Sequence, residues 1–184
     1  RAARESAVLL KNDGILPLSG EETVALIGDF AFMPRYQGAG SSLVNSRRVE
    51  TLRGQLSQRL GAKLIGAASG YARHGDDSKR RAEKRLRRAL KLARKASCVI
   101  FCCGLDEGLD RKTLALPAAQ RRVLHSLADV NPNIILVLSA GSVVDLSVER
   151  DARAVLHGYL GGEAGAGAMA ELLYGEATPM GKLT

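Results

Sequence analysis

Five short apolar runs alternate with segments of helical period along this chain. Apolar runs rich in β-branched residues occupy 23–28, 62–67, 98–103, 134–139 and 153–159. Apolar residues recur with helical spacing in 49–60, 76–96, 117–131 and 163–174. The apolar runs are continuous rather than alternating, which is typical of strands buried on both faces. This order predicts an α/β fold, a three-layer α/β/α sandwich around a mostly parallel sheet of about five or six strands.

Local signals mark the limits of two of these helices. Asp76, Asp77 and Ser78 precede the second helix and suit its N-terminal cap. Pro117 suits the first turn of the third helix, and that helix is expected to end at Asn131 because a proline follows.

Length and composition fit one domain with a sizeable core. The chain has 184 residues, of which 46% are hydrophobic and 25% charged, as in ordinary globular proteins. We expect residues 1–22 to be a linker and entry segment and residues 23–184 to form the domain. Both ends of the sequence have the character of cuts inside a longer polypeptide. No apolar run approaches the roughly 18 to 20 residues of a membrane span, so no membrane partner is expected.

The net charge of +8 raises the question of a nucleic-acid partner. Ten of the 27 basic residues lie within 79–95. In the same segment Leu86, Leu90 and Ala93 follow one another at helical spacing, so the segment predicts an amphipathic helix with a solvated basic face. No aromatic residue interleaves with this basic run, and single-stranded nucleic acid therefore has no stacking platform there. We predict no nucleic-acid partner.

Three cysteines, Cys98, Cys102 and Cys103, lie in one apolar run. Their spacing fits no zinc motif, and an odd number cannot pair fully in disulfides. The interpretation as buried core thiols gives a slight preference for a reducing, cytoplasmic compartment.

Two loops beyond the expected carboxyl ends of strands are richer in glycine and polar groups than simple connections require. The first covers 29–42, and its glycines come too late after the strand for a dinucleotide fingerprint.

The glycines of 161–175 could place a helix N-terminus against an anion or allow that helix to pack closely on the sheet, and the second interpretation is preferred.

The second loop, 104–111, holds three carboxylates and one guanidinium. Such a loop can present a carboxylic acid to a cleft. Spacing alone leaves the alternative open that Asp110 pairs with Arg111 and that Glu107 is merely solvated.

Four segments in order carry a resemblance to a known family. They are ESAVLLKNDGILPL (5–18), TVALIGDFA (23–31) followed by QGAGSS (37–42), EGLDRKTLALPAAQ (107–120), and the glycine-rich closing segment 157–184. Together they resemble the C-terminal α/β-sandwich domain of family 3 glycoside hydrolases. This family includes β-glucosidases.

The resemblance implies a retaining hydrolase that cleaves terminal non-reducing β-D-glucosyl residues from a β-glucoside or β-linked oligosaccharide. A (β/α)8 barrel earlier in the same polypeptide would supply the nucleophilic Asp, and this domain the general acid/base. No metal or organic cofactor is required. The implied site residues are Glu107 as general acid/base with Asp106 as fallback, Ser41 and Ser42 near the sugar, and Gly108, Asp110 and Arg111 as residues that shape the loop.

One position departs from the family pattern. Many members carry ExEGxDR, with the earlier Glu taken as the proton donor, and that position is Leu105 here. The isolated chain is expected to be inactive because the nucleophile lies elsewhere. Two alternatives stay open: a structural family 3 domain without the acid, and a basic nucleotide- or nucleic-acid-binding α/β module.

Overall fold

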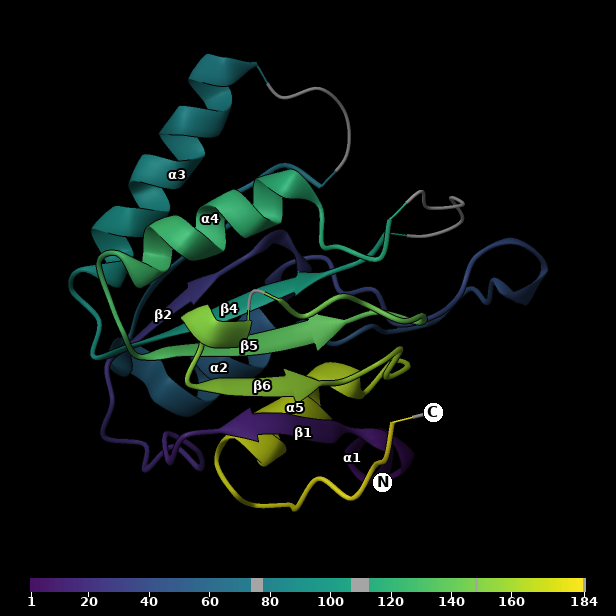
Figure 1. Cartoon of the computed structure of the whole chain (residues 1–184). Helices are drawn as coiled ribbons and strands as arrows, with labels where there is room; N and C mark the ends of the chain where they lie inside the picture. Colours follow the sequence, from purple (N-terminus) through teal and green to yellow (C-terminus); the bar gives the residue numbers. More distant parts are fainter. Residues whose placement is uncertain (74–77, 107–112, 148, 184) are drawn as a thin grey trace.

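The computed structural model describes residues 1–73, 78–106, 113–147 and 149–183, which form one six-stranded sheet between two layers of helices (Figure 1). The strands lie in the order β1-β6-β5-β4-β2-β3. All neighbouring pairs are parallel except β1 with β6. The strands are β1 (Val8–Asn12), β2 (Val24–Ile27), β3 (Leu64–Ala68), β4 (Cys98–Gly104), β5 (Ile134–Ser139) and β6 (Ala154–His157).

The helices cover both faces of the sheet, which confirms the predicted α/β/α sandwich. In Figure 1, α3 and α4 lie together over one face, and α1, α2 and α5 pack on the other. The helices are α1 (Ala2–Ser6), α2 (Leu52–Leu60), α3 (Lys79–Ala93), α4 (Ala118–Ala128) and α5 (Gly165–Leu173). Four single-turn 3-10 segments occupy Asp29–Ala31, Gly40–Ser42, Gly61–Lys63 and Glu149–Asp151.

The edge strand β1 (Val8–Asn12) was not predicted from the pattern. It lies within the segment 1–22 expected to be a linker, and it pairs antiparallel with β6 across an irregularity between Leu9 and Lys11. An edge strand is buried on only part of its surface, so Val8–Asn12 shows neither the continuous apolar run of an inner strand nor a clean alternation. The domain boundary at residue 22 stays a prediction.

The order of the strands predicts a crevice at the carboxyl ends of the strands. After β2 the chain passes to α2 on one face, and after β4 it passes to α4 on the other face. When the loops after two neighbouring parallel strands run to opposite faces of the sheet, a crevice opens between them. Ligands of open α/β sheets bind in such a crevice. Here the crevice lies beyond the carboxyl ends of β2 and β4.

The central strand β4 lies wholly inside the core. All seven of its residues are buried, and the three cysteines are free thiols, as predicted. Burial raises the pKa of Cys102 to about 12, so this thiol stays protonated and is no nucleophile at neutral pH. The Tyr71 hydroxyl donates a hydrogen bond of 2.8 Å to the Cys102 carbonyl, and burial raises the pKa of this phenol well above its ordinary value.

The helix α3 has the amphipathic character that its sequence predicts. Ala89 and Ala93 are buried, and Leu86 and Leu90 are partly buried against the core. Ser78 caps its N-terminus by accepting from the Arg81 N–H. Its basic side chains lie mostly exposed on the remaining surface. Across the described ranges, no helix has both the length and the apolar character needed to cross a bilayer.

Gly28 directly follows β2, at a point where the chain lies very close to β4. It has φ +118°, and a Cβ at this position would lie 1.9 Å from the Cys102 carbonyl oxygen. We expect Gly28→Ala to lower the free energy of unfolding by about 3 kcal/mol, because a disfavoured backbone conformation and a backbone clash add. Chemical denaturation measures the loss.

Gly14→Ala is the matched control for this substitution. Gly14 has φ +77°, but its added Cβ would meet no atom within 4 Å. This variant should lose only about 1 kcal/mol, since backbone conformation alone is affected. Equal losses in the two variants would show that the close approach to Cys102 contributes nothing.

Candidate active site

The acidic segment after β4 starts from a firmly held residue. The side-chain amide of Gln120, on α4, forms two hydrogen bonds with the backbone of Gly104 at the end of β4. The Gly104 N–H donates to Gln120 Oε1 at 2.9 Å, and Gln120 Nε2 donates to the Gly104 carbonyl at 2.9 Å. Gln120 is only 4% exposed. Water therefore competes little for these two bonds, which fix the direction in which the chain leaves the sheet.

Two arginines from different loops hold the next two residues. Arg35, in the loop after β2, donates through Nη1 to the carbonyls of Leu105 at 2.6 Å and Asp106 at 2.8 Å. Arg73, after β3, donates through Nε to Asp106 Oδ1 at 2.6 Å. The Arg73 guanidinium lies 4.2 Å from the centre of the Phe30 ring, and its side chain is 9% exposed. Asp106 is therefore fixed through its backbone and its carboxylate.

The chain is also held where it returns toward α4. The Asp145 N–H donates to the Leu114 carbonyl at 2.8 Å, and Ala115 forms an isolated bridge with Asp145. Leu116 is fully buried. Described residues therefore anchor the chain both before and after 107–112.

Four of the predicted site residues, Glu107, Gly108, Asp110 and Arg111, lie outside the described residues. The fallback acid Asp106 follows the carboxyl end of β4 and is ion-paired with Arg73, and its catalytic role stays a prediction.

The loop 29–50 projects from the same edge of the sheet (Figure 1), and Ser41 and Ser42 lie in its 3-10 segment Gly40–Ser42. The Gln37 side chain closes this loop, because it donates to the Val44 carbonyl at 3.0 Å and accepts from the Val44 N–H at 2.9 Å. The Ser41 side chain is exposed. Within the described part of the chain, no hydrogen bond joins Ser41 to Asp106.

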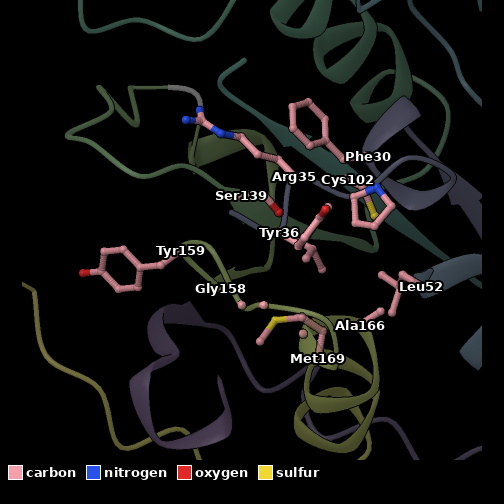
Figure 2. A pocket seen from close by; sticks show the side chains of 15 residues that line it. Phe30, Arg35, Tyr36, Leu52, Cys102, Ser139, Gly158, Tyr159, Ala166 and Met169 are labelled. Carbon is pink, nitrogen blue, oxygen red and sulfur yellow. The ribbon is translucent and has the colours of Figure 1, made fainter. Parts of the chain in front are cut away.

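A small hollow lies between this loop, the ends of β4 and β5, and α5 (Figure 2). Its volume of about 50 Å³ is far below the roughly 300 Å³ at which ligand pockets begin. This hollow by itself is therefore too small to enclose a sugar ring. Among the residues that line it are Phe30, Arg35, Tyr36, Cys102, Ser139 and Met169.

A larger hollow of about 600 Å³ lies beyond the ends of β5 and β6. Apolar residues such as Val143, Val144 and Leu183 dominate its lining. Its buried titratable group is His157, whose Nδ1 lies 3.2 Å from the Leu138 carbonyl and whose pKa burial lowers. The described lining contains no carboxylate, so this hollow offers no carboxyl group for the acid/base role.

The N-terminal turn of α5 bears on the question left by the glycines of 161–175. The Gly167 N–H donates to Glu50 Oε2 at 3.1 Å, and a Cβ on Gly167 would come within 2.7 Å of that oxygen. The contact at Gly167 is with a side-chain carboxylate and not with the sheet, so the preferred interpretation, close packing of this helix on the sheet, stays a prediction. The helix end receives an anion, which is the carboxylate of Glu50.

No ligand set for a metal emerges from the parts of the chain that the structure covers. Within those parts no group of three or more His, Cys, Asp or Glu side chains is placed to hold an ion.

Comparison with known proteins identifies the family. The model of the glycosyl hydrolase family 3 C-terminal domain matches residues 7–184. The chain belongs to this family. The match includes Val8–Asn12, in agreement with the finding that β1 is a strand of the domain's sheet.

The family 3 domain has relatives that match it along its whole length. Thermostable beta-glucosidase B of Acetivibrio thermocellus is 38% identical over 190 residues, which cover 100% of this chain and 25% of that protein. The exo-alpha-(1->6)-L-arabinopyranosidase of Bifidobacterium longum is 35% identical over 199 residues, covering 100% of this chain and 26% of that protein. The chain thus spans about a quarter of the length of these relatives.

A solved structure agrees with the fold of the family 3 domain. The crystal structure of the Bifidobacterium adolescentis GH3 beta-glucosidase superimposes with a TM-score of 0.87 at 36% identity, covering 97% of this chain and 26% of that chain. The α/β sandwich is therefore the C-terminal domain of a glycoside hydrolase, and its relatives are larger enzymes.

Sequence reasoning missed three residues at the crevice of the family 3 domain: Arg35, Arg73 and Gln120. Gln120 left a usable signal, because it falls on the same helical face as Val123, Leu124 and Leu127, and all four are buried. A polar residue in an apolar stripe predicts a buried hydrogen-bonding role. The two arginines left no such signal, since their partners lie about 70 and 33 residues away.

Proposed function

We propose that this domain supplies the general acid/base, Glu107, of a retaining β-glucosidase-like hydrolase. The nucleophilic Asp would come from a (β/α)8 barrel earlier in the same polypeptide, joined to the domain through residues 1–22. The observation that carries the proposal is the triple anchoring of Gly104, Leu105 and Asp106 at the crevice. Glu107 follows directly, and catalytic groups need such a rigid base to be positioned.

The proposed chemistry uses two carboxyl groups in sequence. The barrel Asp attacks the anomeric carbon while protonated Glu107 donates its proton to the departing glycosidic oxygen, which forms a glycosyl ester and free aglycone. Glu107 then takes a proton from water as the water attacks the ester, which releases the sugar and restores both groups. Retention requires the two carboxyl groups to be about 5 to 5.5 Å apart. This reaction needs no metal or organic cofactor.

The geometry favours Glu107 over its neighbours as the acid. Leu105, at the position where many members carry a Glu, has no proton to give and is 3% exposed. Asp106 already accepts from Arg73 at 2.6 Å, so we assign it the role of an anchor. Glu107 is the next carboxyl group along the chain.

The remaining predicted residues complete this proposal. Gly108 would let the backbone turn, and the pair of Asp110 and Arg111 would shape the acidic segment. Ser41 and Ser42, on the loop beyond the same sheet edge, would approach the sugar across the crevice. We propose a β-glucoside or β-linked oligosaccharide as the substrate, because the A. thermocellus relative is named as a beta-glucosidase.

The proposal that the barrel supplies the nucleophile and this domain the acid/base can be tested directly. We expect the 184-residue chain alone to hydrolyse no aryl β-glucoside above the rate in buffer, because the proposed nucleophile lies in the barrel and the hollow lined by Arg35, Cys102 and Ser139 has only about 50 Å³. The full polypeptide with its barrel should hydrolyse the same substrate. Release of the aryl alcohol from a β-glucoside, a β-xyloside and an α-L-arabinopyranoside measures both activity and sugar preference.

Folding of the isolated chain is the control, followed by circular dichroism and a cooperative melt. A folded isolated chain that turns over the β-glucoside would contradict the proposal, since both carboxyl groups would then lie within these 184 residues. A full polypeptide that cleaves only the xyloside or the arabinopyranoside would overturn the proposed sugar.

A further inference from the structure

The positive charge of this domain is concentrated on one helix. Residues 79–95, which form α3 and its C-terminal end, hold ten basic residues and a single acidic one, Glu83. The other 17 basic and 18 acidic residues of the chain nearly cancel. The net charge of +8 is therefore a local property of α3 and not a general property of the surface.

This charge faces outward. The apolar side of α3 packs on the sheet and α4, through residues such as Leu86, Ala89 and Ala93. Arg80, Lys84 and the other basic residues on the opposite side are exposed, apart from the partly buried Arg85. Like charges three and four residues apart on a helix repel one another, and a bound polyanion relieves that repulsion.

A hollow beside α3 gives the basic surface a defined binding position. It has a volume of about 300 Å³ and lies where the carboxyl end of β3 meets α3. Arg81, Lys84, Arg85 and Arg88 line it together with residues 68–70. These four cations recur at helical spacing, so they face the same hollow on successive turns.

We propose that this hollow binds an acidic polysaccharide through the carboxylate groups of the polysaccharide. Guanidinium groups bind carboxylates through two parallel hydrogen bonds, and a repeating anion matches cations that repeat along a helix. The hollow lies at the carboxyl ends of the strands, the edge of the sheet that also carries the candidate active site. The choice of a polysaccharide rests on membership of a carbohydrate-hydrolysing family and not on the assignment of Glu107.

The geometry disfavours two other polyanionic partners. A membrane-binding helix inserts its apolar face, but the apolar face of α3 is occupied by the core. Single-stranded nucleic acid is held by stacking on aromatic rings, and α3 carries no aromatic residue.

Two triple variants of the full polypeptide test the proposal. Arg81→Gln/Lys84→Gln/Arg88→Gln removes three charges from the hollow. Arg80→Gln/Arg87→Gln/Lys91→Gln removes the same residue types from the same helix outside the hollow lining. Gln matches Arg and Lys in helix propensity, and both variants relieve repulsion, so both should fold.

Binding is measured by titration with polygalacturonate, with neutral dextran, duplex DNA and anionic lipid vesicles as comparisons. We expect wild type to bind polygalacturonate and not dextran, with an affinity that falls on the order of 10- to 100-fold between 50 and 200 mM salt. The hollow variant should lose about tenfold in affinity and the control variant at most about twofold to threefold.

Three results would overturn this proposal. They are no binding of polygalacturonate by wild type, equal losses in the two triple variants, and tighter binding of DNA or vesicles than of polygalacturonate at equal salt. Each result is independent of β-glucosidase activity, which the same preparations report separately.

Discussion

Glu107→Gln in the full polypeptide should reduce turnover by about 10² to 10⁴-fold for β-glucosides with poor leaving groups. The glutamine cannot protonate the departing oxygen, and a poor leaving group depends on that proton most. Activated aryl β-glucosides should lose less in the step that forms the glycosyl ester. Turnover across a series of aryl β-glucosides of increasing leaving-group pKa measures this difference as a steeper dependence in the variant.

Azide separates a missing acid/base from a damaged fold. With Glu107→Gln, azide should restore turnover of an activated substrate and give a β-glycosyl azide, because a small anionic nucleophile needs no general base. Asp106→Asn is the matched control, since it changes the neighbouring carboxylate, which pairs with Arg73. If Asp106→Asn shows the rescue and Glu107→Gln keeps full activity, the acid is Asp106.

The fold was predictable because inner parallel strands leave a strong sequence signal. The run 98–103 is continuous and apolar because both faces of β4 are covered, and α3 shows its two faces in the spacing of leucine and arginine. The edge strand Val8–Asn12 left a weaker signal, since its sheet face, its outer face and its free edge meet different surroundings. Its partner β6 lies about 145 residues away, and only the folded chain shows that pairing.

The candidate site was predictable only in outline. The rule that sites lie beyond the carboxyl ends of parallel strands selected both loops, and Asp106 follows the carboxyl end of β4. What holds Asp106 in place could not be predicted, because Arg35 and Arg73 reach it from two other loops. Such contacts depend on how the loops fold over the sheet edge and leave no local periodicity.

These contacts change how the acidic segment should be understood. Three separate elements fix the residues before Glu107: α4 through Gln120, the loop after β2 through Arg35, and the segment after β3 through Arg73. A loop that only connects a strand to a helix does not require so many polar contacts. In the proposed mechanism the segment must hold a carboxyl group in position relative to a second domain, and a displacement of about 1 Å can reduce the rate 100-fold. Gln120 is therefore a positioning residue in the proposed mechanism.

Gln120→Leu should reduce turnover by about 10- to 100-fold and lower the free energy of unfolding by about 3 kcal/mol. Leucine has a similar size but leaves the buried N–H and carbonyl of Gly104 without the amide that now binds both. The loss should be larger for poor leaving groups, as for Glu107→Gln, because the same proton transfer is affected. In the double variant with Glu107→Gln, the second substitution should add little, since the two residues act as a unit.

Asn131→Leu tests whether this loss is specific. Asn131 is also a buried amide next to α4, and its Nδ2 donates to the carbonyls of Ala93 and Ala96 at 2.9 Å, at the opposite edge of the sheet. Its loss should destabilise the domain to a similar degree and leave turnover and its leaving-group dependence unchanged below the melting temperature. If both variants lose turnover equally, or if Gln120→Leu slows good and poor leaving groups alike, Gln120 supports the fold and does not position the acid.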